Sequence, residues 1–150
     1  MIRYAVGAVI FQQSELLLIN KVKISATKEM LTQGEWDFPK GGVEKSDTSF
    51  EAALLRELFE ETGSTQYKII KQLDEKITFP FNQEFINQTG YTKQETTMFL
   101  VEYTGNRTDL LPQDKEIAAI EFFSFEQTLV KLTHQDTKNY LKKMLENKDL

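Results

Sequence analysis

At 150 residues the chain has the length of one ordinary domain, and its 40% apolar content is too high for a disordered protein. The absence of cysteine excludes a disulfide framework and a thiolate metal site, and the net charge of −5 disfavours the broad cationic surface of nucleic-acid-binding proteins. No apolar run reaches membrane-spanning length and the N-terminus lacks a signal-peptide design, so we expect a cytoplasmic protein without a membrane partner.

Alternating apolar residues predict two N-terminal strands, over residues 4–11 and 16–22, joined by a polar turn. A polar stretch follows as far as Gly34. Residues 36–42, with the sequence WDFPKGG, then predict a short strand that runs into a glycine loop. Helical periodicity predicts a helix over residues 49–62, and Gly63 occupies the left-handed position expected at its C-terminus.

The second half of the chain predicts two longer strands, over residues 67–81 and 95–103, separated by a polar loop over residues 82–92. A last strand over residues 117–125 precedes two helices, over residues 125–132 and 137–146, the second capped by Asp136. No repeat, linker or low-complexity segment interrupts this pattern, so we expect a single domain over residues 1–150.

The helix over residues 49–62 has an acidic face. At about 100° per residue, Glu57, Glu60 and Glu61 lie within roughly a third of a turn of one another. Such like charges repel, but Mg²⁺ prefers a few carboxylates together with water and phosphate oxygens, and would convert the repulsion into a binding site. The alternative is a solvated acidic face, which is the commoner state of such helices. The arc expected to pack on a sheet is apolar: Leu54, Leu55, Leu58 and Phe59.

A glycine loop precedes this helix. At Gly41 and Gly42 the backbone carbonyl and N–H groups can approach a ligand closely, because neither residue has a side chain. Lys40 adds a cation for phosphate oxygens, although a lysine before a glycine turn is commonly a surface residue. Thr48, with Glu51 three residues later, has the form of a capping box. A strand, a glycine loop and an acidic helix in this order predict a compact site for metal and phosphate.

The segment from Gly42 to Ser64 resembles the Nudix box. That signature is a glycine, five residues, a glutamate, seven residues and then Arg-Glu-aliphatic-x-Glu-Glu-x-Gly, usually followed by an aliphatic residue. Thr48 stands where the first glutamate is expected, and Ser64 stands where the aliphatic residue is usual. The other positions match: Gly42, Arg56, Glu57, Leu58, Glu60, Glu61 and Gly63. The resemblance implies a Nudix-type α/β/α sandwich with a mixed sheet, and hydrolysis of a phosphoanhydride bond in a nucleoside diphosphate linked to another moiety.

The same resemblance implies roles for individual residues. Glu57, Glu60 and Glu61 are the expected carboxylate ligands of Mg²⁺ or Mn²⁺, with the carbonyl of Gly41 as a further ligand. Arg56 is expected to orient the glutamates, and Glu57 is the candidate base, a role that varies within the family. The metal lowers the pKa of a bound water, which attacks phosphorus in line.

Two further positions bear on this site. Glu116 lies six residues before Phe122 on the last predicted strand, a spacing at which the family often places another metal ligand or base; an ordinary loop charge is the equal alternative. Thr48 cannot act as a carboxylate, so Glu44 or Asp47 in the same loop is the nearest replacement. Because the three helix glutamates remain, we expect activity.

The segment before the box resembles dinucleoside-polyphosphate hydrolases and bacterial RNA 5′-pyrophosphohydrolases. Arg3 matches an arginine that the RNA enzymes place near the 5′ phosphates, and we expect it to bind substrate together with Lys40 and Gly42. Trp36 either stacks on a base or belongs to the core. The acidic balance makes a small nucleotide, a dinucleoside polyphosphate, the first candidate substrate. RNA 5′ ends and nucleoside triphosphates are the alternatives, and ADP-ribose and nucleotide sugars remain open.

Two other functional classes compete with this hypothesis. A Nudix module that binds nucleotide as a sensor, without hydrolysis, is supported only by Thr48. A calcium-binding or interaction domain is disfavoured because the alternating Asp/Asn ligands of a calcium loop are absent. Phosphate-loop, paired-histidine zinc and nucleophile-elbow motifs are also absent, and the only histidine, His134, lies between the two C-terminal helices.

Overall fold

The computed structural model describes residues 1–24 and 33–150, so most of the polar stretch before Gly34 lies outside the described residues. The strands of the described part form one eight-stranded sheet with the order β3-β2-β1-β7-β5, in which β4 also pairs with β1, β6 with β7 and β8 with β2. Only β1 and β7 are parallel among these pairs. The strands are β1 (Ile2–Gln12), β2 (Glu15–Lys21), β3 (Glu35–Asp37), β4 (Lys40–Gly42), β5 (Tyr67–Gln72), β6 (Ile77–Pro80), β7 (Lys93–Tyr103) and β8 (Ile117–Ser124).

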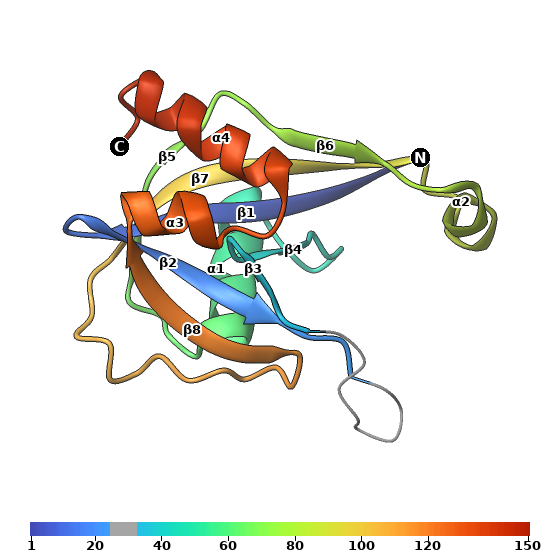
Figure 1. The fold of residues 1–150 in the computed structure, drawn as a ribbon. Coiled ribbons are helices and arrows are strands. Elements are labelled where there is room, and N and C mark those ends of the chain that lie inside the picture. The colour runs from blue at the N-terminus through green and yellow to red at the C-terminus, as the bar shows by residue number, and fades with distance from the viewer. Residues whose placement is uncertain (25–32) are drawn as a thin grey trace.

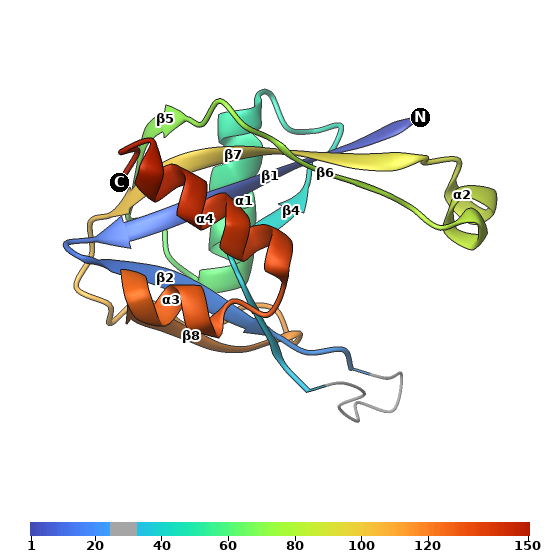
Figure 2. The same ribbon diagram turned by 45° about the horizontal axis from the view of Figure 1, so that its top comes forward.

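Helices cover both faces of this sheet (Figure 1). Helix α1 (Phe50–Thr62) lies on one face, whereas α3 (Phe125–Lys131) and α4 (Gln135–Glu146) lie on the other. Figure 2 shows the same three layers, with α2 (Gln83–Thr89) beyond the end of the sheet near the N-terminus. The expected α/β/α sandwich with a mixed sheet is confirmed.

The alternation of side chains along β1 produces the two cores of this sandwich. Val6, Ala8 and Ile10 belong to the apolar cluster beneath α1, whereas Val9 belongs to the cluster beneath α3 and α4. Successive side chains of a strand point to opposite faces, so a strand covered on both sides must be apolar on both. The continuous run of buried residues in β1 follows from this constraint.

Helix α1 begins and ends as its terminal residues dictate. The side chain of Ser49 accepts a hydrogen bond from the N–H of Ala52 at 3.0 Å, and this bond satisfies one of the free N–H groups of the first turn. Gly63 has φ 77°, and its N–H donates to the carbonyl of Phe59, as expected for a left-handed cap. The capping box expected at Thr48 is wrong, because the chain enters the helix one residue later.

The buried face of α1 is rotated relative to the expected apolar arc. Leu54 and Leu58 are buried as expected, but Leu55 is 42% exposed and Phe59 is 47% exposed. Glu61 lies on the buried side instead. The helix therefore presents one of its box glutamates to the interior of the protein.

Two expectations in the second half of the chain are wrong. The strand expected over residues 67–81 is interrupted between β5 and β6, where Leu73 turns into the core and its N–H donates to the carbonyl of Met98 at 2.8 Å. The loop expected over residues 82–92 contains α2. The side chain of Asn82 caps this helix by accepting from the N–H of Phe85, and Gly90 ends it at φ 79°. Short helices need such caps at both ends because so few of their backbone groups pair internally.

The C-terminal helix also differs from its expected start. It begins at Gln135, with His134 as its N-terminal cap and no side-chain hydrogen bond to the first turn, so Asp136 lies inside the helix and does not cap it. His134 pairs with Glu35 of β3 at 2.9 Å, a contact between exposed side chains. This contact agrees with a surface role for the only histidine.

Ser64, the second departure from the box, has a structural explanation. Its side chain is buried, and its hydroxyl donates to Asp109 at 2.5 Å and accepts from the N–H of Gln66 at 3.0 Å. Tyr103 also donates to Asp109. The hydrogen bond from Ser64 is the largest of the contacts that lower the pKa of Asp109 to about 2. The loop after β7 is thereby tied to the end of α1.

This network predicts an acid-dependent stability. The folded pKa of Asp109 lies below its ordinary value of 3.8, so its contribution to the free energy of unfolding is present above pH 4 and is lost as pH falls toward 2. Asp109→Asn should therefore be less stable than wild type at pH 7, with a smaller fall between pH 4 and pH 2. Urea denaturation across this range measures both quantities, with Asp74→Asn as an exposed control. Parallel curves for Asp109→Asn and wild type would contradict the prediction.

Helix α1 is held on the sheet by its buried leucines. Leu58→Ala should lower the free energy of unfolding by about 2–5 kcal/mol, because it opens a cavity in the cluster beneath α1. Leu55→Ala makes the same exchange on the exposed side of the same helix, and should change stability by about 0.5 kcal/mol. Urea denaturation compares the two variants, and equal losses would show that the helix does not depend on its buried face.

Candidate active site

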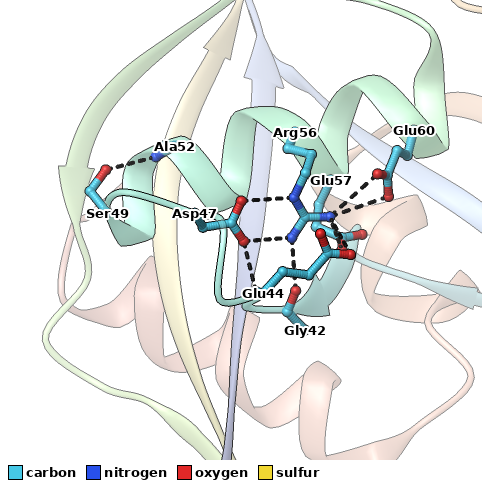
Figure 3. A network of polar contacts seen from close by, with 8 residues as sticks. All are labelled: Gly42, Glu44, Asp47, Ser49, Ala52, Arg56, Glu57 and Glu60. Atoms are coloured by element: carbon cyan, nitrogen blue, oxygen red, sulfur yellow. Dashed lines mark hydrogen bonds and ion pairs between the residues drawn. The ribbon is translucent and has the colours of Figure 1, made fainter.

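Arg56 lies at the centre of a polar network on α1 (Figure 3). Its Nε and Nη2 donate to the two carboxylate oxygens of Asp47 at 2.9 and 2.7 Å, and Nη2 also donates to the carbonyl of Gly42 at 2.9 Å. Its Nη1 donates to Glu57 at 2.9 Å and lies 3.4 Å from Glu60. These contacts lower the pKa of Asp47 to about 2, through the bond from Arg56 above all, and raise the pKa of Arg56. One guanidinium thus joins the glycine strand, the loop and two box glutamates.

Glu57 lies directly against the backbone of Gly41. A Cβ atom added to Gly41 would come within 2.0 Å of the carboxyl carbon of Glu57, so any larger residue at this position would displace the carboxylate from the strand. Strand β4 fixes one side of this contact by pairing with β1, where Gly41 is opposite Val6. Burial raises the pKa of Glu57, and the hydrogen bond from Arg56 opposes the increase. Two of the expected metal-binding residues are therefore in contact.

Glu61 reaches the same region from the buried side of α1. Its side chain is only 4% exposed, and Oε2 lies 3.3 Å from the Nζ of Lys21. Its other oxygen, Oε1, is buried and has no hydrogen-bond partner among the described residues. Burial raises the pKa of Glu61 to about 7, although Lys21 opposes this shift. A buried carboxylate oxygen without a partner is unfavourable, and a bound cation would satisfy it.

Lys21 is a site residue that sequence reasoning missed. Leu17 and Ile19 of β2 point into the cluster beneath α1, and Lys21 follows them at the same two-residue spacing. This alternation is the signal that could have placed the lysine opposite the acidic helix. The ion pair with Glu61 makes it the cation that faces the buried end of the acidic face.

The carboxylates of the expected metal site differ in their surroundings. Glu60 is exposed and forms an ion pair with Arg56. Within residues 1–24 and 33–150, no three His, Cys, Asp or Glu side chains lie close enough together to hold one metal ion. Mg²⁺ is commonly held by only one or two carboxylates, with water and substrate phosphates completing its shell. The free oxygen of Glu61 and the contact of Glu57 with Gly41 fit such a site. The full ligand set of Glu57, Glu60, Glu61 and Gly41 stays a prediction.

Arg3 and Gly42, two expected substrate-binding residues, lie together. A Cβ on Gly42 would come within 2.5 Å of Nη2 of Arg3, so the guanidinium lies on the glycine backbone, and Arg3 also donates to Gln94 of β7. Lys40 belongs to β4, as Gly42 does, and its Nζ forms an ion pair with Asp37 at 3.1 Å. Arginine binds phosphate through several N–H donors, so Arg3 places such donors directly beside the glycine loop.

Trp36 lies in an apolar environment. Its ring packs edge-on against Phe123 at a centroid distance of 5.2 Å, as part of the cluster beneath α3 and α4. This position supports the core interpretation, whereas the box glutamates are on α1 across the sheet. Stacking of a base on Trp36 stays a prediction, and no contact of this side chain with the other described residues favours it.

Glu116 lies near Lys21 rather than among the box glutamates. Its carbonyl accepts from the N–H of Val22 at 2.8 Å, and the residue is exposed in the turn just before β8. It lines a cavity of about 320 Å³ together with Lys21, Val22, Lys23 and Glu35. Because Lys21 pairs with Glu61, the cavity adjoins the buried end of the acidic face. Its role as a metal ligand or base remains a prediction.

The comparisons with known proteins agree with this geometry. A family model described as NUDIX domain matches residues 1–144. The chain belongs to the NUDIX family. The assignment to the Nudix hydrolases that was made from the box is therefore confirmed. No helix among the described residues is long and apolar enough to span a membrane.

Relatives with similar sequences are RNA pyrophosphohydrolases. The protein of that name from Helicobacter pylori is 31% identical over 117 residues, which are 75% of this chain and 74% of that protein. The one from Campylobacter jejuni is 29% identical over 122 residues, 80% of this chain and 78% of that protein.

Solved structures of low sequence identity share the fold. The MutT protein from Methanosarcina mazei has a TM-score of 0.69 at 21% identity, over 99% of this chain and 96% of that chain. An Ap4A hydrolase from C. elegans has a TM-score of 0.67 at 19% identity, over 96% of each chain.

Glu116 can be tested against a matched residue of the strand that follows it. If Glu116 is a metal ligand or a second base, Glu116→Gln should lower turnover by about 100-fold or more while leaving the fold intact. Glu121→Gln makes the same exchange at another exposed position of β8 and should leave turnover unchanged. Steady-state kinetics and thermal unfolding of both variants provide the comparison. A near-normal rate for Glu116→Gln would remove this residue from the site.

Proposed function

We propose that this protein is a divalent-metal-dependent pyrophosphohydrolase that acts on the polyphosphate at the 5′ end of a nucleotide. The observation that carries this proposal is that two charged side chains contact neighbouring residues of β4. Glu57 lies on Gly41 from the α1 side, and Arg3 lies on Gly42, the next residue. A carboxylate that can hold a cation and a guanidinium that can bind phosphate oxygens thus contact adjacent glycines of β4, and groups of these two kinds stabilise the charge of a phosphoryl group during transfer.

Each acidic residue has a distinct part in the proposed mechanism. Glu57 and Glu61 would hold Mg²⁺ or Mn²⁺, with Glu60 and the carbonyl of Gly41 as further ligands. When bound, the ion would neutralise phosphate charge and lower the pKa of a water, so that the water loses its proton more readily and attacks phosphorus. Arg56 keeps Glu57 in its orientation through the 2.9 Å hydrogen bond. Glu57 accepts the proton of the attacking water.

The basic residues bind the substrate in this scheme. Arg3 donates to the phosphate oxygens that lie beside Gly42, and Lys40 adds a second cation from the same strand. Arg3 is favoured over Lys40 as the main contact, because Lys40 already has an ion-pair partner in Asp37. The local positive charge is compatible with the net charge of −5, since only a few phosphates need to be bound.

RNA with a 5′-triphosphate is the favoured substrate, ahead of a dinucleoside polyphosphate. Two observations support this order: the relatives described above are named RNA pyrophosphohydrolases, and Arg3 occupies the position beside the glycine loop that the resemblance to such enzymes implies. The acidic balance argues against contacts along a strand, but an enzyme that acts on the first nucleotide does not need them.

The proposal is tested with a substrate panel. The protein is incubated with Mg²⁺, and separately with Mn²⁺, in the presence of a 5′-triphosphorylated oligoribonucleotide, diadenosine tetraphosphate or ATP. Released phosphate, pyrophosphate and nucleotides are separated by chromatography. We expect the RNA end to be cleaved with the highest kcat/KM, and the Glu60→Gln/Glu61→Gln double variant to be inactive because it loses two carboxylates of the metal site.

The outcomes distinguish the alternatives. Faster cleavage of diadenosine tetraphosphate would restore the dinucleoside polyphosphate as the substrate. Nucleotide-induced thermal stabilisation without cleavage of any substrate would contradict the proposal and support a nucleotide sensor.

A further inference from the structure

The position at which the box normally has its first glutamate carries no charge in this protein. Thr48 is exposed, and helix α1 is capped by Ser49 instead. The carboxylate nearest to it in the chain is that of Asp47, which points into the network around Arg56 (Figure 3). The loop therefore retains an acidic side chain, displaced by one residue.

Asp47 is held rigidly. Both of its oxygens accept from Arg56, in the two-pronged geometry that gives arginine–carboxylate pairs their directionality. Oδ2 also accepts from the N–H of Glu44 at 2.8 Å, and the N–H of Asp47 donates to the carbonyl of Glu44 at 3.0 Å. The side chain is only 5% exposed. The hydrogen bonds of this turn thus hold the carboxylate in place in addition to the contacts with Arg56.

The opposite side of the same guanidinium contacts the box glutamates. Nη1 of Arg56 donates to Glu57, whose carboxylate lies on Gly41, and Nη2 donates to the carbonyl of Gly42. A guanidinium anchored on one side has a single orientation available on the other. The orientation of the Glu57 carboxylate over the glycine strand is therefore determined in part by Asp47.

We propose that Asp47 is a positioning residue that replaces the missing glutamate of the box. It anchors Arg56 and balances its charge, so that Arg56 orients Glu57 without competing strongly with a cation for the carboxylates. Without Asp47, Arg56 would turn toward its other acceptors, Glu57 and Glu60. The inference rests on the proposed function only for the identity of the cation-binding carboxylates.

The test measures metal binding directly, in the absence of substrate. Mn²⁺ is titrated into wild-type protein and into Asp47→Asn, and the free Mn²⁺ is followed by electron paramagnetic resonance. Asp47→Asn keeps the shape of the side chain but removes its charge. We expect the dissociation constant for Mn²⁺ to rise by about 10-fold or more, as is usual when a residue that orients a metal ligand is lost.

A transposed variant tests the replacement itself. Asp47→Ser/Thr48→Glu moves the carboxylate back to the position that the box prescribes, and should recover most of the Mn²⁺ affinity that Asp47→Ser alone loses. Thr48→Glu alone should have little effect, because Arg56 is already anchored. Glu51→Gln, an exposed acid of the first turn of α1, is the matched control for charge and should bind Mn²⁺ as wild type does.

Thermal unfolding separates positioning from a purely structural role. The proposal would be overturned if Asp47→Asn unfolded at a lower temperature but bound Mn²⁺ as tightly as wild type. It would also be overturned if the transposed variant folded but did not recover affinity for Mn²⁺. A larger effect of Glu44→Gln would assign the role to Glu44. Wild-type protein that binds no Mn²⁺ would overturn both the metal centre and this role. Affinity lost in Asp47→Asn and regained by transposition would support the inference even if no substrate of the panel were cleaved, and only the proposed function would then fail.

Discussion

The contact between Glu57 and the backbone of Gly41 is the constraint on which the site depends. In this arrangement it depends on a glycine, since a Cβ would push the carboxylate away, and it requires α1 to lie close against β4. The closeness of the helix comes from the buried leucines of α1, and the position of β4 comes from its pairing with β1. A hydrophobic cluster and a strand register thus determine where a charged group lies, and the polar network around Arg56 only refines its orientation.

The sequence alone predicted local structure well where a motif fixes the spacing of residues. The three box glutamates, Arg56 and the cap at Gly63 follow from a single local pattern, and the sandwich follows from the family that this pattern implies. The prediction failed where tertiary packing decides. The buried face of α1 includes Glu61 and excludes Leu55, because the helix rotates to fit the sheet, and periodicity defines a face only to within a residue or two.

Long-range pairs were the other gap. Lys21 faces Glu61 because β2 passes beneath the end of α1. The alternation along β2 indicates the face on which Lys21 lies, but not which residue of α1 it meets. The same holds for Ser64 and Asp109, which are 45 residues apart. By contrast, α2 was missed although its signals were local: Asn82 and Gly90 are suitable caps, and a polar composition concealed them.

The two departures from the box share one physical feature. At Ser64 an aliphatic contact is replaced by a hydrogen bond to Asp109, and at Thr48 the carboxylate is displaced to Asp47. In both cases a group that needs a polar partner finds one elsewhere in the chain. The end of α1 is bound through Asp109, and the guanidinium of Arg56 is bound by Asp47. A motif written as residue types at fixed positions therefore understates what the fold requires, which is a charge or a hydrogen bond at a fixed place in space. Arg56 shows this most clearly, because a buried or half-buried guanidinium must be balanced, and an aspartate within reach can do so from a neighbouring position.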